Sequence, residues 1–181
     1  MKISVSSYSF QQYIGTGRMS HFDTIRKAQE MGFEAIEFLD MPRPTYEEQL
    51  AYAADLRAEA DACGMTINAY TIGACLYQDT PERNAAEVER LKRQVDIAAV
   101  LGCSVMRHDA CYSLGSTGNA RSFGLMLPTI AANIRAVTEY AATKGIRTAV
   151  EPRLCGTGQL SRRAAVQCGS ARQFRTAGGC R

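Results

Sequence analysis

The stretch Leu101-Gly102-Cys103-Ser104-Val105-Met106-Arg107-His108 holds the pattern that decides the fold: a helix end, a glycine, and a short strand that ends in polar residues. The glycine stands where a helix needs a left-handed C-terminal residue before the chain reverses. This unit occurs four times, with glycines at Gly32, Gly64, Gly102 and Gly145. With a first strand at residues 3–7, the sequence predicts five strands, the others at 35–38, 66–70, 104–108 and 148–151.

The helices between these strands carry their own start signals. These are a capping box from Thr45 to Glu48, an N-cap followed by proline at Thr80-Pro81, and a cap at Ser20 with Asp23. Apolar residues recur at helical spacing, at Val88, Leu91, Val95 and Ala98 and again at Ile130, Ile134, Val137 and Ala141. Such stripes are typical of helices packed on a sheet. We expect the polar residues Glu87, Glu89, Arg90 and Arg93 to form a solvated face.

Strands that alternate with capped helices predict an α/β fold with parallel strands and right-handed crossovers. A doubly wound open sheet and a (β/α)8 barrel both fit this order. The first strand runs into Ser6-Ser7-Tyr8-Ser9-Phe10 and not into a glycine-rich phosphate loop, which weakens the dinucleotide-binding alternative. Polar residues at several strand ends favour a TIM-barrel type of fold, because a barrel builds its site at that rim.

The charge of the chain changes abruptly after Glu151. Residues 1–151 contain 15 of the 21 basic and all 18 acidic side chains, a formal charge of −3. Residues 152–181 contain six Arg, no acid, five Gly and three Cys, so the overall +3 comes from this segment alone. The whole-chain charge is therefore no indication of a nucleic-acid partner. We expect one domain at 1–151 and a basic Arg/Gly/Cys-rich tail at 152–181.

Hydropathy and cysteine spacing suggest a cytoplasmic protein. No window approaches the ~18 consecutive apolar residues of a membrane span, and Met1 leads directly into a strand pattern with no charged leader. The cysteines of the first 151 residues lack zinc-knuckle spacing and are interpreted as small buried residues without disulfides, at Cys63, Cys75, Cys103 and Cys111.

Four residues at predicted strand ends are candidates for chemistry: Tyr8, Glu37, His108 and Glu151. Glu151 is the strongest, because a carboxylate that ends an apolar strand is costly unless it is paired or metal-bound. A capping or salt-bridged carboxylate is the alternative. Glu37 could simply pair with a basic neighbour, and His108 could be a hydrogen-bonded structural residue or a ligand. Tyr8 could close the barrel mouth or stack on a sugar.

Three motifs together resemble the first half of a sugar phosphate isomerase/epimerase of the xylose-isomerase-like TIM-barrel superfamily. They are Gly32-Phe33-Glu34-Ala35-Ile36-Glu37, residues 101–108, and Gly145-Ile146-Arg147-Thr148-Ala149-Val150-Glu151. The resemblance implies that Glu151 is a divalent-metal ligand and moves a proton, and that Tyr8, Glu37 and His108 contact the substrate. It also implies Mn²⁺ or Mg²⁺ and proton abstraction next to a carbonyl through an enediolate.

The family pattern stops at Glu151, where Pro152-Arg153-Leu154-Cys155 stands in place of the family's Asn-His-Gly. We interpret 152–181 as family sequence translated in a shifted frame, because a one-nucleotide shift of Val166–Arg181 can encode a sixth-strand motif. A barrel of this type needs ~250 residues. The chain is then truncated after about five strands and inactive. The alternative is a genuine disordered basic extension that contacts RNA or an acidic partner.

Two other function classes stay open. An apurinic-site endonuclease on the same scaffold would use His108 and Glu151 for Zn²⁺, but the acidic charge of residues 1–151 and Tyr70 at the third strand argue against it. A non-catalytic fragment or interaction module could associate with itself through an unpaired sheet edge. The expected partner is otherwise a small sugar or sugar phosphate, with no membrane and no nucleic acid.

Overall fold

The structure, a computed structural model, describes residues 3–111 and 123–151 of the chain. The strands are β1 (Ser4–Ser6), β2 (Ala35–Phe38), β3 (Thr66–Ile72), β4 (Val105–Asp109) and β5 (Arg147–Glu151). They form one sheet in the order β1-β2-β3-β4-β5. The predicted α/β architecture with five parallel strands is therefore confirmed. The tail predicted at 152–181 lies outside the described residues.

The helices begin where their sequence signals stand. They are η1 (Ser7–Phe10), a 3-10 helix, α1 (Gln11–Gly15), α2 (His21–Glu30), α3 (Tyr46–Ala62), α4 (Pro81–Leu101) and α5 (Phe123–Thr143). The capping box predicted at Thr45 and the cap predicted at Ser20 both form, and both are capping boxes. Each hydroxyl accepts a backbone N–H, and the carboxylate three residues on accepts the backbone N–H of the cap residue. Thr80 likewise accepts the Arg83 N–H at 3.3 Å.

The predicted glycine caps are confirmed. All four adopt positive φ, at 83° for Gly32, 67° for Gly64, 73° for Gly102 and 71° for Gly145. A residue with a side chain is strained at such an angle, which is why a glycine follows each of these four helices.

The described residues divide into two compact units. The first unit consists of residues 3–71 and 96–105, and the second of residues 72–95, 106–111 and 123–151. In the first unit β1, β2 and β3 pair in parallel, with Val5 opposite Ile36 and Ile36 opposite Ile67. The β2–β3 register shifts after Ile36, so that Glu37 lies opposite Ala69.

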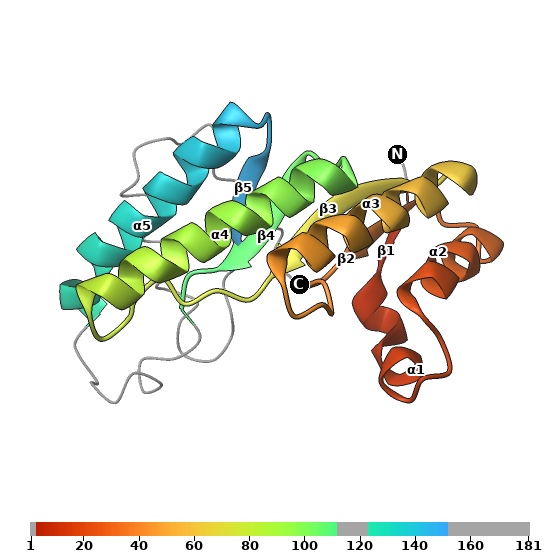
Figure 1. Ribbon diagram of the computed structural model, residues 1–181, viewed down its shortest axis with the longest axis horizontal. Coiled ribbons are helices and arrows are strands. Elements are labelled where there is room, and N and C mark those ends of the chain that lie inside the picture. Colours follow the sequence, from red (N-terminus) through yellow and green to blue (C-terminus); the bar gives the residue numbers. More distant parts are fainter. Residues whose placement is uncertain (1–2, 112–122, 152–181) are drawn as a thin grey trace. The chain divides into compact units, whose positions relative to one another are not determined.

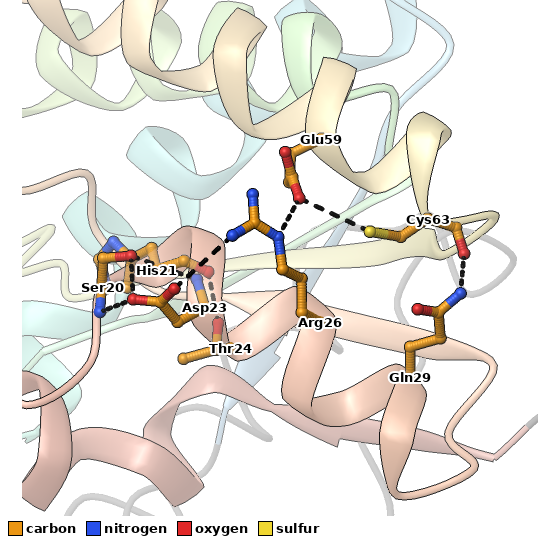
Figure 2. A network of polar contacts seen from close by, with 8 residues as sticks. All are labelled: Ser20, His21, Asp23, Thr24, Arg26, Gln29, Glu59 and Cys63. Atoms are coloured by element: carbon orange, nitrogen blue, oxygen red, sulfur yellow. Dashed lines mark hydrogen bonds and ion pairs between the residues drawn. The ribbon is translucent and has the colours of Figure 1, made fainter.

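Polar contacts join α2 to α3 in the first unit (Figure 2). Arg26 Nε donates to Glu59 Oε1 at 2.7 Å, and Gln29 Nε2 donates to the Cys63 carbonyl at 2.6 Å. The Cys63 thiol also lies 3.6 Å from Glu59 Oε1. These groups lie near solvent, where screening leaves an ion pair little effect on stability. We therefore assign them to helix orientation and not to a functional site.

In the second unit α5 packs along β5 (Figure 1). Its predicted apolar stripe is buried, and so is the stripe of α4, which confirms both helix phases. A buried polar pair joins α5 to β5, because the Thr138 and Thr148 hydroxyls lie 2.8 Å apart. Within residues 3–111 and 123–151, no helix is both long enough and apolar enough to cross a membrane.

Four of the five strands differ from their predicted bounds: β4 is shifted by one residue, β5 begins one residue earlier, and β1 and β3 end at other residues. β1 ends at Ser6 because η1 begins at Ser7, whose side chain is buried. β3 continues two residues beyond the predicted 66–70, through Thr71 to Ile72. Both added residues are buried, so packing extends this strand past its most regular sequence pattern.

Candidate functional site

The four predicted site residues divide between the units, with Tyr8 and Glu37 in the first and His108 and Glu151 in the second. Glu37 is the third residue of β2 and is half-buried. The hydroxyl of Thr71, on β3, donates a hydrogen bond to Glu37 Oε1. A hydroxyl donor from the neighbouring strand therefore holds this carboxylate in place.

Tyr8 lies in the 3-10 turn that follows β1. Its backbone N–H donates to the Ser6 hydroxyl at 3.3 Å, and its side chain is 67% exposed. Phe10 on the same turn is buried and anchors it. The Tyr8 ring is thus open to a ligand, and its role in substrate binding stays a prediction.

Glu151 is the last residue of β5 and forms an ion pair with Arg107 of β4. Arg107 Nη1 lies 3.1 Å from Glu151 Oε1, and the two side chains are 27% and 35% exposed. Glu151 is thus salt-bridged, as one of the two interpretations of the sequence expected, and this ion pair is one contact of its carboxylate. The pair orients Glu151 without shielding it from solvent, so the carboxylate can still meet a small molecule.

His108 is fully buried near the end of β4. Its Nδ1 lies 2.9 Å from the Asp109 carbonyl oxygen, a geometry in which Nδ1–H donates. Burial lowers the pKa of His108, and Arg90 adds to this, while the Asp109 hydrogen bond and Glu87 act in the opposite direction. The imidazole is therefore neutral at pH 7.

The other ring nitrogen of His108 has no hydrogen-bond partner within the described part of the chain. With Nδ1 protonated, Nε2 is an acceptor. Leaving a buried acceptor unpaired costs about 1–3 kcal/mol, and such groups are frequent where a ligand or a water completes the site. His108 is therefore suited to accept one hydrogen bond from a bound hydroxyl.

Glu87 and Arg90 form a contact that the sequence analysis missed, because it placed both on a solvated face of α4. Glu87 Oε2 lies 2.8 Å from Arg90 Nε, and Glu87 Oε1 accepts the Cys75 N–H at 3.0 Å. Arg90 Nη2 donates to the Gly73 carbonyl at 2.7 Å. The pair thereby fixes the β3–α4 loop to α4. The spacing of three residues is compatible with an ion pair on one helix face, but it gives no sign of the backbone partners.

A surface hollow of ≈ 290 Å³ lies beside this pair, lined by Gln78, Arg83, Ala86, Glu87 and Arg90. Its two arginines already bind carboxylates, since Arg83 Nη1 lies 2.9 Å from Asp79 Oδ2. The hollow is polar and close to charge-neutral, which suits an uncharged polar molecule better than an anion.

The described residues do not by themselves fit a divalent metal. Among residues 3–111 and 123–151, no group of three or more His, Cys, Asp or Glu side chains is arranged to hold a metal ion. Glu151 could supply one oxygen ligand, whereas Mn²⁺ and Mg²⁺ require several.

A family model described as xylose isomerase-like TIM barrel matches residues 25–165. Solved structures with the same fold include 3-keto-D-glucoside 4-epimerase YcjR from E. coli (TM-score 0.71, 16% identity, covering 97% of this chain and 67% of that one). D-psicose 3-epimerase from Clostridium cellulolyticum H10 gives a TM-score of 0.76 at 15% identity, covering 97% and 62%. A xylose isomerase domain protein from Planctomyces limnophilus gives 0.60 at 16%, covering 84% and 55%.

The comparison with curated proteins gives no match. The chain spans about two thirds or less of the length of these solved structures. At these identities the likeness shows the fold alone.

Proposed function

Because the chain belongs to the xylose isomerase-like TIM barrel family, we propose that it is part of an enzyme that isomerises or epimerises a sugar or sugar phosphate. The reaction is proton abstraction from a carbon next to a carbonyl, through an enediolate. The two epimerases of like fold support this reaction class. The negative charge of residues 1–151 argues against a nucleic-acid substrate.

The observation that carries the proposal is the position of Glu151. Its carboxylate ends a buried strand, remains partly exposed, and is oriented by Arg107. A carboxylate held in this way can take a proton from a sugar carbon and return it, which is general base and then general acid catalysis. In the same unit, Nε2 of His108, which has no hydrogen-bond partner among residues 3–111 and 123–151, would accept a hydrogen bond from a substrate hydroxyl. Contacts from Tyr8 and Glu37 stay predictions.

We propose that the metal supports the reaction only in a complete barrel. Glu151 would give one ligand to Mn²⁺ or Mg²⁺, whose charge stabilises an enediolate when bound. Since the described residues supply no cluster of further ligands, we propose that the 181-residue chain binds these ions poorly and is inactive. We further propose a cytoplasmic location and a shifted reading frame after codon 151.

The test uses two proteins: the 181-residue chain, and a chain whose reading frame is restored after codon 151, called here the frame-restored chain. Each is incubated in deuterium oxide with Mn²⁺ and one substrate, which is D-psicose, D-tagatose, D-fructose or the phosphate of one of these ketoses. Deuterium at the carbon next to the carbonyl is measured by NMR. We expect exchange with at least one ketose only for the frame-restored chain. No exchange with any ketose or ketose phosphate, or DNA that offers no restoring frame, would contradict the proposal.

A further inference from the structure

Two cysteine thiols lie in contact in the second unit. The sulfur atoms of Cys75 and Cys111 are 3.5 Å apart, although 36 residues separate them in the sequence. Cys75 follows β3 and Cys111 follows β4. We propose that these two cysteines are a redox modification site, which a hydroperoxide converts into a reversible disulfide.

The surrounding backbone already holds the two segments in place for this bond. The Leu76 N–H, one residue after Cys75, donates to the carbonyl of Ala110, one residue before Cys111, at 2.8 Å. Glu87 and Gln78 bind the backbone of Cys75 at 3.0 and 2.9 Å. A disulfide needs a sulfur–sulfur distance of about 2.05 Å, so closure requires the two sulfur atoms to approach each other by about 1.5 Å.

The two thiols differ in access to solvent, which sets the order of the reaction. Cys75 is half-buried, whereas Cys111 is 2% exposed. The Cys75 thiolate attacks the hydroperoxide and becomes a sulfenic acid, while the hydroperoxide is reduced to an alcohol, or to water when the oxidant is hydrogen peroxide. The thiol of Cys111 then attacks the sulfenic sulfur, which forms the sulfur–sulfur bond and releases one water. Two thiols and one hydroperoxide thus give one disulfide, one water and one alcohol, the alcohol being a second water in the case of hydrogen peroxide.

The two other described cysteines make different contacts and serve as internal controls. The Cys103 thiol lies 3.3 Å from the Ala98 carbonyl oxygen, and burial raises its pKa to about 11. The Cys63 thiol faces Glu59, and its pKa is also raised, first by desolvation. A raised pKa disfavours the reactive thiolate, so we expect Cys63 and Cys103 to react slowly with the peroxide.

The disulfide would close a loop that contains α4 and the first residues after β4, because both lie between Cys75 and Cys111. Closing such a loop lowers the entropy of the unfolded chain and stabilises the folded one. Oxidation should therefore raise the thermal midpoint of the 181-residue chain, and a dithiol reductant should reverse the shift.

The test treats the reduced 181-residue chain with hydrogen peroxide, blocks free thiols with an alkylating agent, and maps peptides under non-reducing conditions. We expect a Cys75–Cys111 cross-linked peptide that lacks two hydrogen atoms and disappears after dithiothreitol. Cys75→Ser and Cys111→Ser should each abolish it, while Cys63→Ser leaves it unchanged. The proposal is overturned if both thiols remain alkylated, if they oxidise separately to sulfinic acids, or if the cross-link survives either single serine variant.

Discussion

Arg107 Nη1 lies 3.1 Å from Glu151 Oε1, which joins the middle of β4 to the end of β5 through two half-exposed side chains. A pair this open to water contributes less than about 1 kcal/mol to stability. The contact therefore matters more for the orientation of Glu151 than for the fold. Its effect on stability can be separated from its effect on activity.

Arg107→Met should change the free energy of unfolding in urea by less than about 1 kcal/mol, because solvent screens the ion pair. Arg147→Met, at an exposed position of β5, is the matched control. In the frame-restored chain, Arg107→Met should slow ketose exchange while Arg147→Met leaves it near wild type. A large loss of stability in Arg107→Met would show that the pair is structural.

The buried hydroxyl pair between Thr138 and Thr148 offers a sharper test of the α5–β5 packing. Thr148→Val should cost about 1–3 kcal/mol because it leaves a buried hydroxyl without its partner. Adding Thr138→Val should recover much of this loss, since replacing both partners removes the unpaired group. A double-mutant cycle in urea measures the coupling, and strictly additive losses would contradict the hydrogen bond.

Gly102 and Gly145 both end helices at positive φ, but their surroundings differ. A Cβ at Gly102 would lie 1.3 Å from Nη1 of Arg57, whereas nothing lies within 4 Å of one at Gly145. Both Ala variants should lose about 1–2 kcal/mol from backbone strain. Gly102→Ala should lose about 1 kcal/mol more, because Arg57 must give up its bond to the Leu101 carbonyl, 3.2 Å away.

The control for this prediction is the Arg57→Ala background. There the guanidinium is absent, so Gly102→Ala and Gly145→Ala should lose equal stability in thermal or urea unfolding. If the extra loss at Gly102 persists without Arg57, its cause is not the clash that the structure shows.

His108 should make stability depend on pH. Burial lowers its folded-state pKa below the ordinary histidine value of about 6.5, so the unfolded chain binds more protons as pH falls past that value. The stabilising contribution is present above about pH 6.5 and is lost as pH falls toward the folded-state pKa. His108→Gln should flatten the fall in urea midpoint between about pH 7 and 5.

His21 contributes to the same pH range, because burial and then Arg43 lower its pKa. His21→Gln alone should leave most of the pH dependence of the urea midpoint, since His21 is only half-buried. The double variant His21→Gln/His108→Gln should remove this dependence. These are the two histidines of the chain. A slope that His108→Gln leaves unchanged would contradict the buried neutral imidazole.

Structural features that depend only on residues close together in the sequence could be predicted. The capping boxes at Ser20 and Thr45 and the left-handed glycines depend on contacts within four residues, and all are confirmed. The alternation of strand and helix then gave the parallel sheet. The end of β3 was predicted two residues too early, because burial and not pattern carries it to Ile72.

Contacts between distant segments could not be predicted in this way. Glu87 was interpreted as solvated because helical spacing shows its face but not the β3–α4 loop that returns to it. Cys75 and Cys111 were interpreted as separate buried residues, because their separation of 36 residues indicates no pairing. At Glu151, strand-end position suggested both a functional carboxylate and a salt bridge, and only the fold supplied Arg107 as its partner.

Deuterium exchange into a ketose shows whether Glu151 moves the proton in the proposed sugar isomerase or epimerase. In the frame-restored chain we predict that Glu151→Gln abolishes exchange, while Glu139→Gln on α5 retains it and both variants keep the wild-type circular dichroism spectrum. Exchange at the wild-type rate in Glu151→Gln would contradict the account.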